Sequence, residues 1–108
     1  MDPDAMLRAL AVPARLSIFR QLLERKHCVR SLSKKLGITE SAVSQHMKVL
    51  REAGLAEAQP YGRHIHFLPR QEALDYLAAA FGQMRDRAAA QDREDRTCRC
   101  EYREERER

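Results

Sequence analysis

Apolar residues recur at helical spacing through the first half of the chain and predict four consecutive helices. The first covers about residues 4–10. The second opens after Val12, with Pro13 in its first turn, where the missing N–H costs nothing. Its buried stripe is predicted to consist of Leu16, Phe19, Leu22 and Leu23. The third covers about residues 29–36 and stops at Gly37, the residue best suited to a left-handed C-terminal cap.

The fourth helix lies in the stretch SAVSQHMKVLREAGL, residues 41–55, and carries two contrasting faces. Val43, Met47 and Leu50 are spaced i, i+4, i+7 and predict a buried stripe. The opposite face holds small or amide-bearing hydrogen-bonding side chains, where a merely solvated helix more often carries Glu–Lys pairs. Thr39 can cap this helix, so only the tripeptide GIT separates it from the helix before. This arrangement predicts a helix-turn-helix, whose second helix enters the DNA major groove.

A hairpin is predicted directly after the fourth helix. Gly54 followed by apolar Leu55 predicts a stop of Schellman type for that helix. The apolar period then changes to two, with Ile65 and Phe67 on alternate positions, and PYGR at residues 60–63 supplies the turn. A hairpin that follows a recognition helix is a wing.

The helical period returns from residue 71 to about residue 92 and predicts one long helix with a short coiled-coil seam. We expect a homodimer to form through this seam and the first helix, using Met6, Leu7, Leu10, Leu74, Leu77, Phe81 and Met84. The sequence thus predicts a mainly α fold with a small β-hairpin wing. Residues 1–92 form one winged helix-turn-helix domain for DNA binding and dimerisation, and residues 93–108 form a charged, flexible tail that contains cysteines.

Composition fits one small domain with a polyanionic partner. A chain of 108 residues with 44% hydrophobic content can bury one modest core. Residues 29–70 hold seven Lys/Arg against three Asp/Glu, which accounts for the whole net charge of +4. No apolar run approaches a membrane span and the N-terminus lacks the features of a signal peptide, so we expect a cytoplasmic protein without a membrane partner. Three cysteines argue against a disulfide framework.

The stretches LRALAVPARLSIFRQLL, CVRSLSKKLGITESAVSQHMKVLREAGL and GRHIHFLP, in this order, resemble the ArsR/SmtB family of bacterial winged-helix transcriptional repressors. The resemblance runs from about residue 6 to residue 81. It implies a homodimer that binds a palindromic operator in double-stranded DNA and leaves it when an effector binds, in many members a metal or metalloid ion. No cofactor is required for DNA binding.

The DNA-contacting residues are predicted from the helix geometry. The candidates lie on the outward face of the fourth helix, at the end of the third and at the wing tip: Lys35, Ser41, Ser44, Gln45, His46, Lys48 and Arg63. Gln45 can make a bidentate pair with adenine, whereas Lys35 and Lys48 suit phosphates. Arg63 can reach a phosphate or a narrow minor groove.

For the sensing site, the sequence leaves two chemistries open. Arsenite-responsive family members carry Cys-Val-Cys-x-x-Cys where this chain has CVRSLS, so only Cys28 matches that motif. The family's other common site needs histidines on the last helix, and residues 71–97 contain none. Cys98 and Cys100 could bind a thiophilic ion such as As(III), with Cys28 of the same or the partner chain as a third ligand. The same thiols could instead sense oxidants.

Two other classes of function fit the sequence less well. Scattered acids, only four glycines and the absence of a nucleophile motif argue against an enzyme. A winged helix can also serve as a protein-interaction adaptor, but apolar anchors would then be expected on the fourth helix in place of its polar face. His64 and His66 share a strand face, and ordinary phosphate or solvent contacts explain them better than a metal site does.

Overall fold

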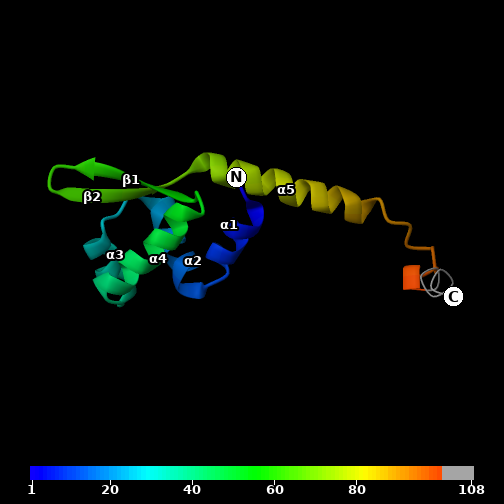
Figure 1. Cartoon of the computed structure of the whole chain (residues 1–108), viewed down its shortest axis with the longest axis horizontal. Helices are drawn as coiled ribbons and strands as arrows, with labels where there is room; N and C mark the ends of the chain where they lie inside the picture. The colour runs from blue at the N-terminus through cyan, green and yellow to red at the C-terminus, as the bar shows by residue number, and fades with distance from the viewer. Residues whose placement is uncertain (101–108) are drawn as a thin grey trace.

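The computed structural model describes residues 1–100 and has five helices and one two-stranded antiparallel sheet. The elements follow the order α1 (Pro3–Leu10), α2 (Pro13–Glu24), α3 (Val29–Leu36), α4 (Glu40–Glu52), β1 (Ala56–Tyr61), β2 (His64–Pro69) and α5 (Gln71–Ala89). Helices α1 to α4 pack at one end, and α5 runs away from them toward the tail (Figure 1). The predicted mainly α fold with a hairpin wing is confirmed.

The helix limits follow from local capping signals. Thr39 Oγ1 accepts the backbone N–H of Ala42 at 3.0 Å, which satisfies one free donor at the start of α4. Gly37 ends α3 with φ of 69°, a left-handed conformation that costs glycine little. These two caps fix the short turn between α3 and α4, as predicted.

The end of α4 is a Schellman motif. The N–H of Gly54 donates to the carbonyl of Arg51, and the N–H of Leu55 donates to the carbonyl of Leu50, both at 3.0 Å. Gly54 has φ of 81°, and Leu50 and Leu55 are both fully buried, which supplies the apolar contact typical of this motif. The predicted stop is confirmed, and it turns the chain directly into the hairpin.

The wing is a hairpin in which Ala56 pairs with Pro69 at its base and Tyr61 pairs with His64 at its tip. Its two-residue loop has Gly62 first, with φ of 58°, as a type II′ turn requires. A second contact holds the base of the wing. His27, between α2 and α3, exchanges backbone hydrogen bonds with Phe67 at 2.8 and 3.3 Å. This bridge fastens β2 to the helical part, and no motif in the sequence indicates it.

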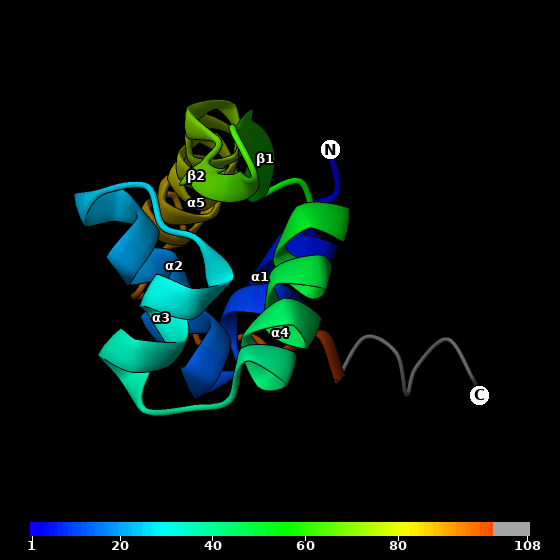
Figure 2. The same cartoon turned by 90° about the vertical axis from the view of Figure 1, so that its left-hand side faces the viewer.

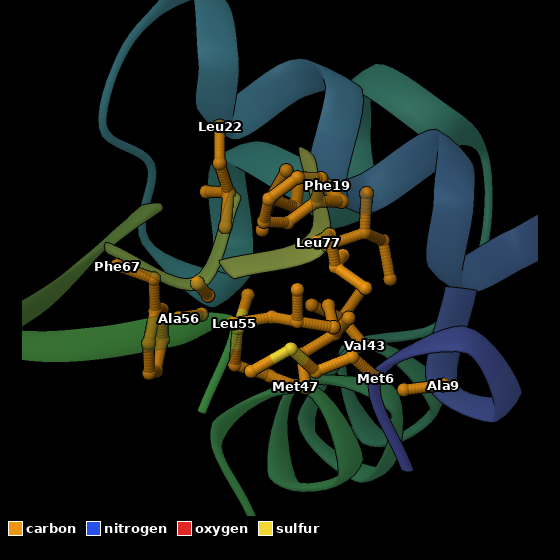
Figure 3. Packing of buried hydrophobic residues seen from close by; sticks show 14 residues of the cluster. Met6, Ala9, Phe19, Leu22, Val43, Met47, Leu55, Ala56, Phe67 and Leu77 are labelled. Carbon is orange, nitrogen blue, oxygen red and sulfur yellow. The ribbon is translucent and has the colours of Figure 1, made fainter. Parts of the chain in front are cut away.

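One core joins the helices to the base of the wing (Figure 3). Its largest fully buried members come from all four short helices and from the residue before the hairpin: Met6, Ile18, Leu22, Leu32, Val43, Met47, Leu50 and Leu55. Phe67 of β2 and Leu77 of α5 also enter it, and Figure 3 shows Leu77 beside Phe19. The predicted buried stripe of α4 is therefore confirmed.

One sequence prediction about burial is wrong. Leu23 is 52% exposed, and Ile18 takes its place on the buried side of α2. The buried face of α2 is therefore rotated slightly about the helix axis relative to the stripe predicted from residues 16, 19, 22 and 23. Ile65 is 52% exposed, because the hairpin extends beyond the helices at that point and only Phe67 reaches the core.

The end of α5 lies close to the predicted domain boundary. Residues 91–100 follow this helix as an exposed segment. The last part of the predicted tail, residues 101–108, lies outside the described residues. Among residues 1–100, no helix has the length and apolar character needed to cross a bilayer.

Candidate nucleic-acid interface

The outward face of α4 carries the polar side chains that the sequence singled out. Ser41, Ser44, Gln45 and Lys48 are exposed, and His46 is half-buried at the edge of this face. The opposite side of α4 is buried in the core, where Val43, Met47 and Leu50 are at most 1% exposed. Rotation of α4 would expose these three side chains, so the polar face has a fixed direction.

Lys48 forms the one ion pair on this helix among the described residues. Its Nζ lies 4.0 Å from Glu52 Oε1, one helical turn away, and both side chains are well exposed. Such a pair contributes little in water, since solvent screens it and both side chains lose freedom. Lys48 is thus free to exchange Glu52 for a stronger anion such as a phosphate.

Arg63 lies at the tip of the wing and is exposed. On the face of the hairpin opposite Ile65 and Phe67, the rings of Tyr61 and His66 stack 5.0 Å apart and nearly parallel. Lys26 Nζ lies 5.7 Å from the Tyr61 ring centroid, within the range of a cation–π contact. These contacts connect the tip of the hairpin, next to Arg63, to the segment that follows α2.

A groove of about 590 Å³ lies between the inner face of the wing, α4 and the start of α3. Figure 2 faces this end of the molecule and shows the hairpin above α3 and α4. Of the predicted residues, Ser44, Lys48 and Arg63 line the groove, whereas Lys35, Ser41, Gln45 and His46 lie outside it. Arg30 and Arg51 also line it, and neither was predicted as a site residue. Their only sequence signal was membership of the basic segment 29–70.

Cys28 has a structural role that the sequence did not indicate. Its Sγ accepts the backbone N–H of Ser31 at 3.4 Å and so caps the start of α3. This hydrogen bond lowers the pKa of the Cys28 thiol, because it favours the charged form. Next to it, burial and the charge of Arg25 lower the pKa of His27, whose Nδ1 lies 2.9 Å from Ser31 Oγ.

The tail thiols lie together but far from Cys28 of the same chain. The Sγ atoms of Cys98 and Cys100 are 2.8 Å apart, and both residues are exposed. The hydrogen bond from Cys100 lowers the pKa of Cys98. Residues 93–100 and α3 lie at opposite ends of the described part of the chain (Figure 1). Within residues 1–100, no three potential ligands from His, Cys, Asp and Glu gather in one place, so one chain alone does not assemble the predicted three-thiol set.

The residues predicted for the dimer interface fall into three groups. Met6 and Leu77 are buried in the chain's own core, at 0% and 5% exposure. Phe81 and Met84, farther along α5, are 50% and 56% exposed and do not belong to that core. The remaining three, Leu7, Leu10 and Leu74, are half-buried against the core. Along the predicted seam, the exposed residues therefore lie beyond Leu77.

The elements α3 and α4, the turn between them and the hairpin after them form a winged helix-turn-helix. The family described as "Bacterial regulatory protein, arsR family" matches residues 12–58. The chain is 30% identical over 93 residues to the uncharacterised HTH-type transcriptional regulator YbzH of Bacillus subtilis, covering 72% of this chain and 93% of YbzH. This chain belongs to the ArsR family of bacterial regulatory proteins.

Other relatives agree with this assignment. The chain is 42% identical over 60 residues to the HTH-type transcriptional repressor SmtB of Mycobacterium tuberculosis, which covers 56% of this chain but only 44% of SmtB. The structure of an ArsR-like transcriptional regulator from Rhodococcus sp. RHA1 superposes with a TM-score of 0.73 at 25% identity, covering 82% of this chain and 86% of that one. The expected family is confirmed.

If Cys28 caps α3, its replacement by Ala should lower the free energy of unfolding by about 0.5–1 kcal/mol, and replacement by Ser should not. Urea denaturation at one protein concentration, followed by circular dichroism, measures both. Equal stability of the Ala and Ser variants would show that the thiol caps nothing.

The same variants test the pKa of Cys28. The folded pKa is lowered, so between it and the ordinary thiol value of about 8.5 the unfolded chain holds a proton that the folded chain has lost. The wild type should therefore gain stability as pH rises toward about 8.5 and lose this gain as pH falls through the folded pKa. The Ser variant should lack the gain.

Proposed function

We propose that this chain is a transcriptional repressor that binds a palindromic operator as a homodimer and is released by an effector. The observation that carries the proposal is the exposed polar face of α4, with Ser44, Gln45 and Lys48, held beside a wing that ends in Arg63. In helix-turn-helix proteins the start of the second helix contacts base edges. Relatives such as SmtB are named as repressors, which supports this direction of control.

The residues of this face have separate tasks in the proposal. The Gln45 amide donates to and accepts from adenine N6 and N7, and the serines bond to bases or phosphates. Lys35 and Lys48 hold phosphates. His46, at the edge of the face, contacts a base or a phosphate. Arg63 enters the minor groove or holds a phosphate beside it. The polar character of the face favours DNA over a protein partner and a regulatory role over a catalytic one. The proposed location is the cytoplasm.

Dimerisation is proposed to use the exposed apolar residues of α5. Phe81 and Met84 are large, apolar and about half exposed on one side of a helix that projects from the domain. A second copy that packs its own α5 there would cover them, with Leu7, Leu10 and Leu74 at the margin of the contact. Two α4 helices related by a twofold axis would then enter successive major grooves about 34 Å apart.

The effector is proposed to act on the paired thiols of the tail. Cys98 and Cys100 are exposed and adjacent in space, and the hydrogen bond from Cys100 lowers the pKa of Cys98. Two thiolates can bind one soft ion such as As(III), and Cys28 of the partner chain is the remaining candidate for a third ligand. The short distance between the two Sγ atoms also supports an alternative in which the thiols sense an oxidant. Both thiols would lose a proton and an electron to peroxide, forming one disulfide and water.

Replacing Gln45 by Ala should cost about 1–3 kcal/mol of operator binding and relax the preference for one base pair. Replacing Lys48 by Ala should instead weaken binding to every sequence alike and flatten its salt dependence. Fluorescence anisotropy with operator and scrambled duplexes separates the two effects. Wild-type operator affinity in both variants would refute this assignment of the α4 face.

Phe81→Glu should dissociate the dimer and lower DNA affinity, because it would bury an unpaired charge between the chains at a cost of roughly 3–5 kcal/mol. Phe81 is exposed in the single chain, so the fold should survive, whereas a charge at Leu77 would enter the core. Gln83→Glu is the matched control, since two positions along a helix lie on opposite sides. A Phe81→Glu protein that sediments as a dimer would exclude this surface.

Changing Cys98 and Cys100 together to Ser should abolish release from DNA by As(III) or by peroxide, whichever acts on the wild type, and leave operator affinity unchanged. Effector titrations of the protein–DNA complex measure both. Release of the double variant at wild-type As(III) concentrations would rule out the tail as the binding site. Release of the wild type by peroxide but not by As(III) would select the redox version.

A further inference from the structure

The groove between the wing and α4 concentrates positive charge from three elements. Arg30 comes from the first turn of α3, Lys48 and Arg51 from α4, and Arg63 from the wing tip. Among the described residues, Glu40 is the one acidic side chain that lines it. No Asp or Glu within residues 1–100 forms an ion pair with any of the three arginines. Three unpaired guanidinium groups around one groove repel each other, so an anion placed there is stabilised.

Arg51 lies in this groove beside an aromatic ring. Its guanidinium carbon lies 5.9 Å from the centroid of the Phe67 ring, and Phe67 is buried at the base of the wing. Stacking on an aromatic ring is a contact that arginine makes well while its N–H donors stay free. The ring therefore limits the orientations of Arg51 before any ligand arrives, which lowers the entropy cost of binding.

The geometry of duplex DNA indicates what occupies the groove. A helix in the major groove and a wing tip in the adjacent minor groove are separated by one sugar–phosphate strand. That strand must pass between α4 and the wing, where the basic groove lies. Its phosphates suit the arginines, and the exposed side chain of Ile65 offers an apolar contact for a sugar.

We propose that this groove is the seat of one DNA backbone strand and that Arg30 and Arg51 bind its phosphates. The assignment rests on the proposed function, and it adds a phosphate-binding site that lies apart from the base-contacting residue Gln45. Arg30 and Arg51 hold the duplex in register without selecting its sequence. Lys48 and Arg63 also line the groove and complete the site.

The test uses the full-length variants Arg30→Gln and Arg51→Gln, with Arg20→Gln as the control for loss of one exposed positive charge. Arg20 lies on α2, which does not line the groove. Binding is measured against salt concentration with two duplexes of about 30 base pairs, long enough for two half-sites, one a selected operator and one of arbitrary sequence. Each groove variant should bind both duplexes about tenfold more weakly. The slope of log affinity against log salt should fall by about 0.9 for each phosphate that the variant no longer neutralises, and by twice that in a symmetric dimer.

Two further variants exclude a loss of folding as the cause. Arg51→Lys keeps the charge and should keep most of the salt slope, although it loses the fit to the Phe67 ring. Glu40→Gln removes the one acid of the groove and should tighten binding to both duplexes. Groove variants that behave like Arg20→Gln, while Gln45→Ala loses operator binding, would overturn the groove proposal and leave the proposed function intact. A wild type that binds neither duplex would overturn both.

Discussion

The burial of one side of α4 determines how the rest of the molecule is used. Val43, Met47 and Leu50 are enclosed by helices from the whole N-terminal half, so α4 cannot rotate without exposing them to water. Each would cost about 1.5–3 kcal/mol if it were exposed. This constraint holds the polar face outward and gives Gln45 a fixed position. The same core is completed by Leu55 at the start of the hairpin, which ties the direction of the wing to the direction of α4.

The wing depends on this core through its base, and its tip extends beyond it. Phe67 connects the hairpin to the helices twice, through its buried ring and through its backbone bonds to His27. The guanidinium group of Arg51 lies over the same ring, so one residue anchors the wing and contacts a basic side chain of the groove. Loss of this anchor would therefore disturb the fold and the proposed DNA site together. Beyond Phe67 the hairpin is free of the core, and Arg63 is exposed at its end.

Local sequence signals allowed most of the fold to be predicted. Contacts between distant segments could not be predicted in this way. Gly37 and Thr39 act on their own neighbours, so the ends of α3 and α4 could be placed from the sequence. The bridge from His27 to β2 joins segments about 40 residues apart, and no local pattern encodes it. Arg51 could not be predicted because its place in the groove depends on the hairpin folding back beside α4. Leu77 has the spacing of a dimer seam, and spacing alone cannot distinguish a partner chain from the chain's own core.

The central claim is that the polar face of α4 and the wing tip together bind duplex DNA. Titration of the isotope-labelled protein with an operator duplex, followed by the backbone amide signals in NMR spectra, tests it directly at each residue. The account predicts that the largest shifts fall in residues 40–48 and 61–65, with small changes at the far end of α5. Large shifts confined to α5 or the tail, with α4 and the wing unchanged, would contradict it.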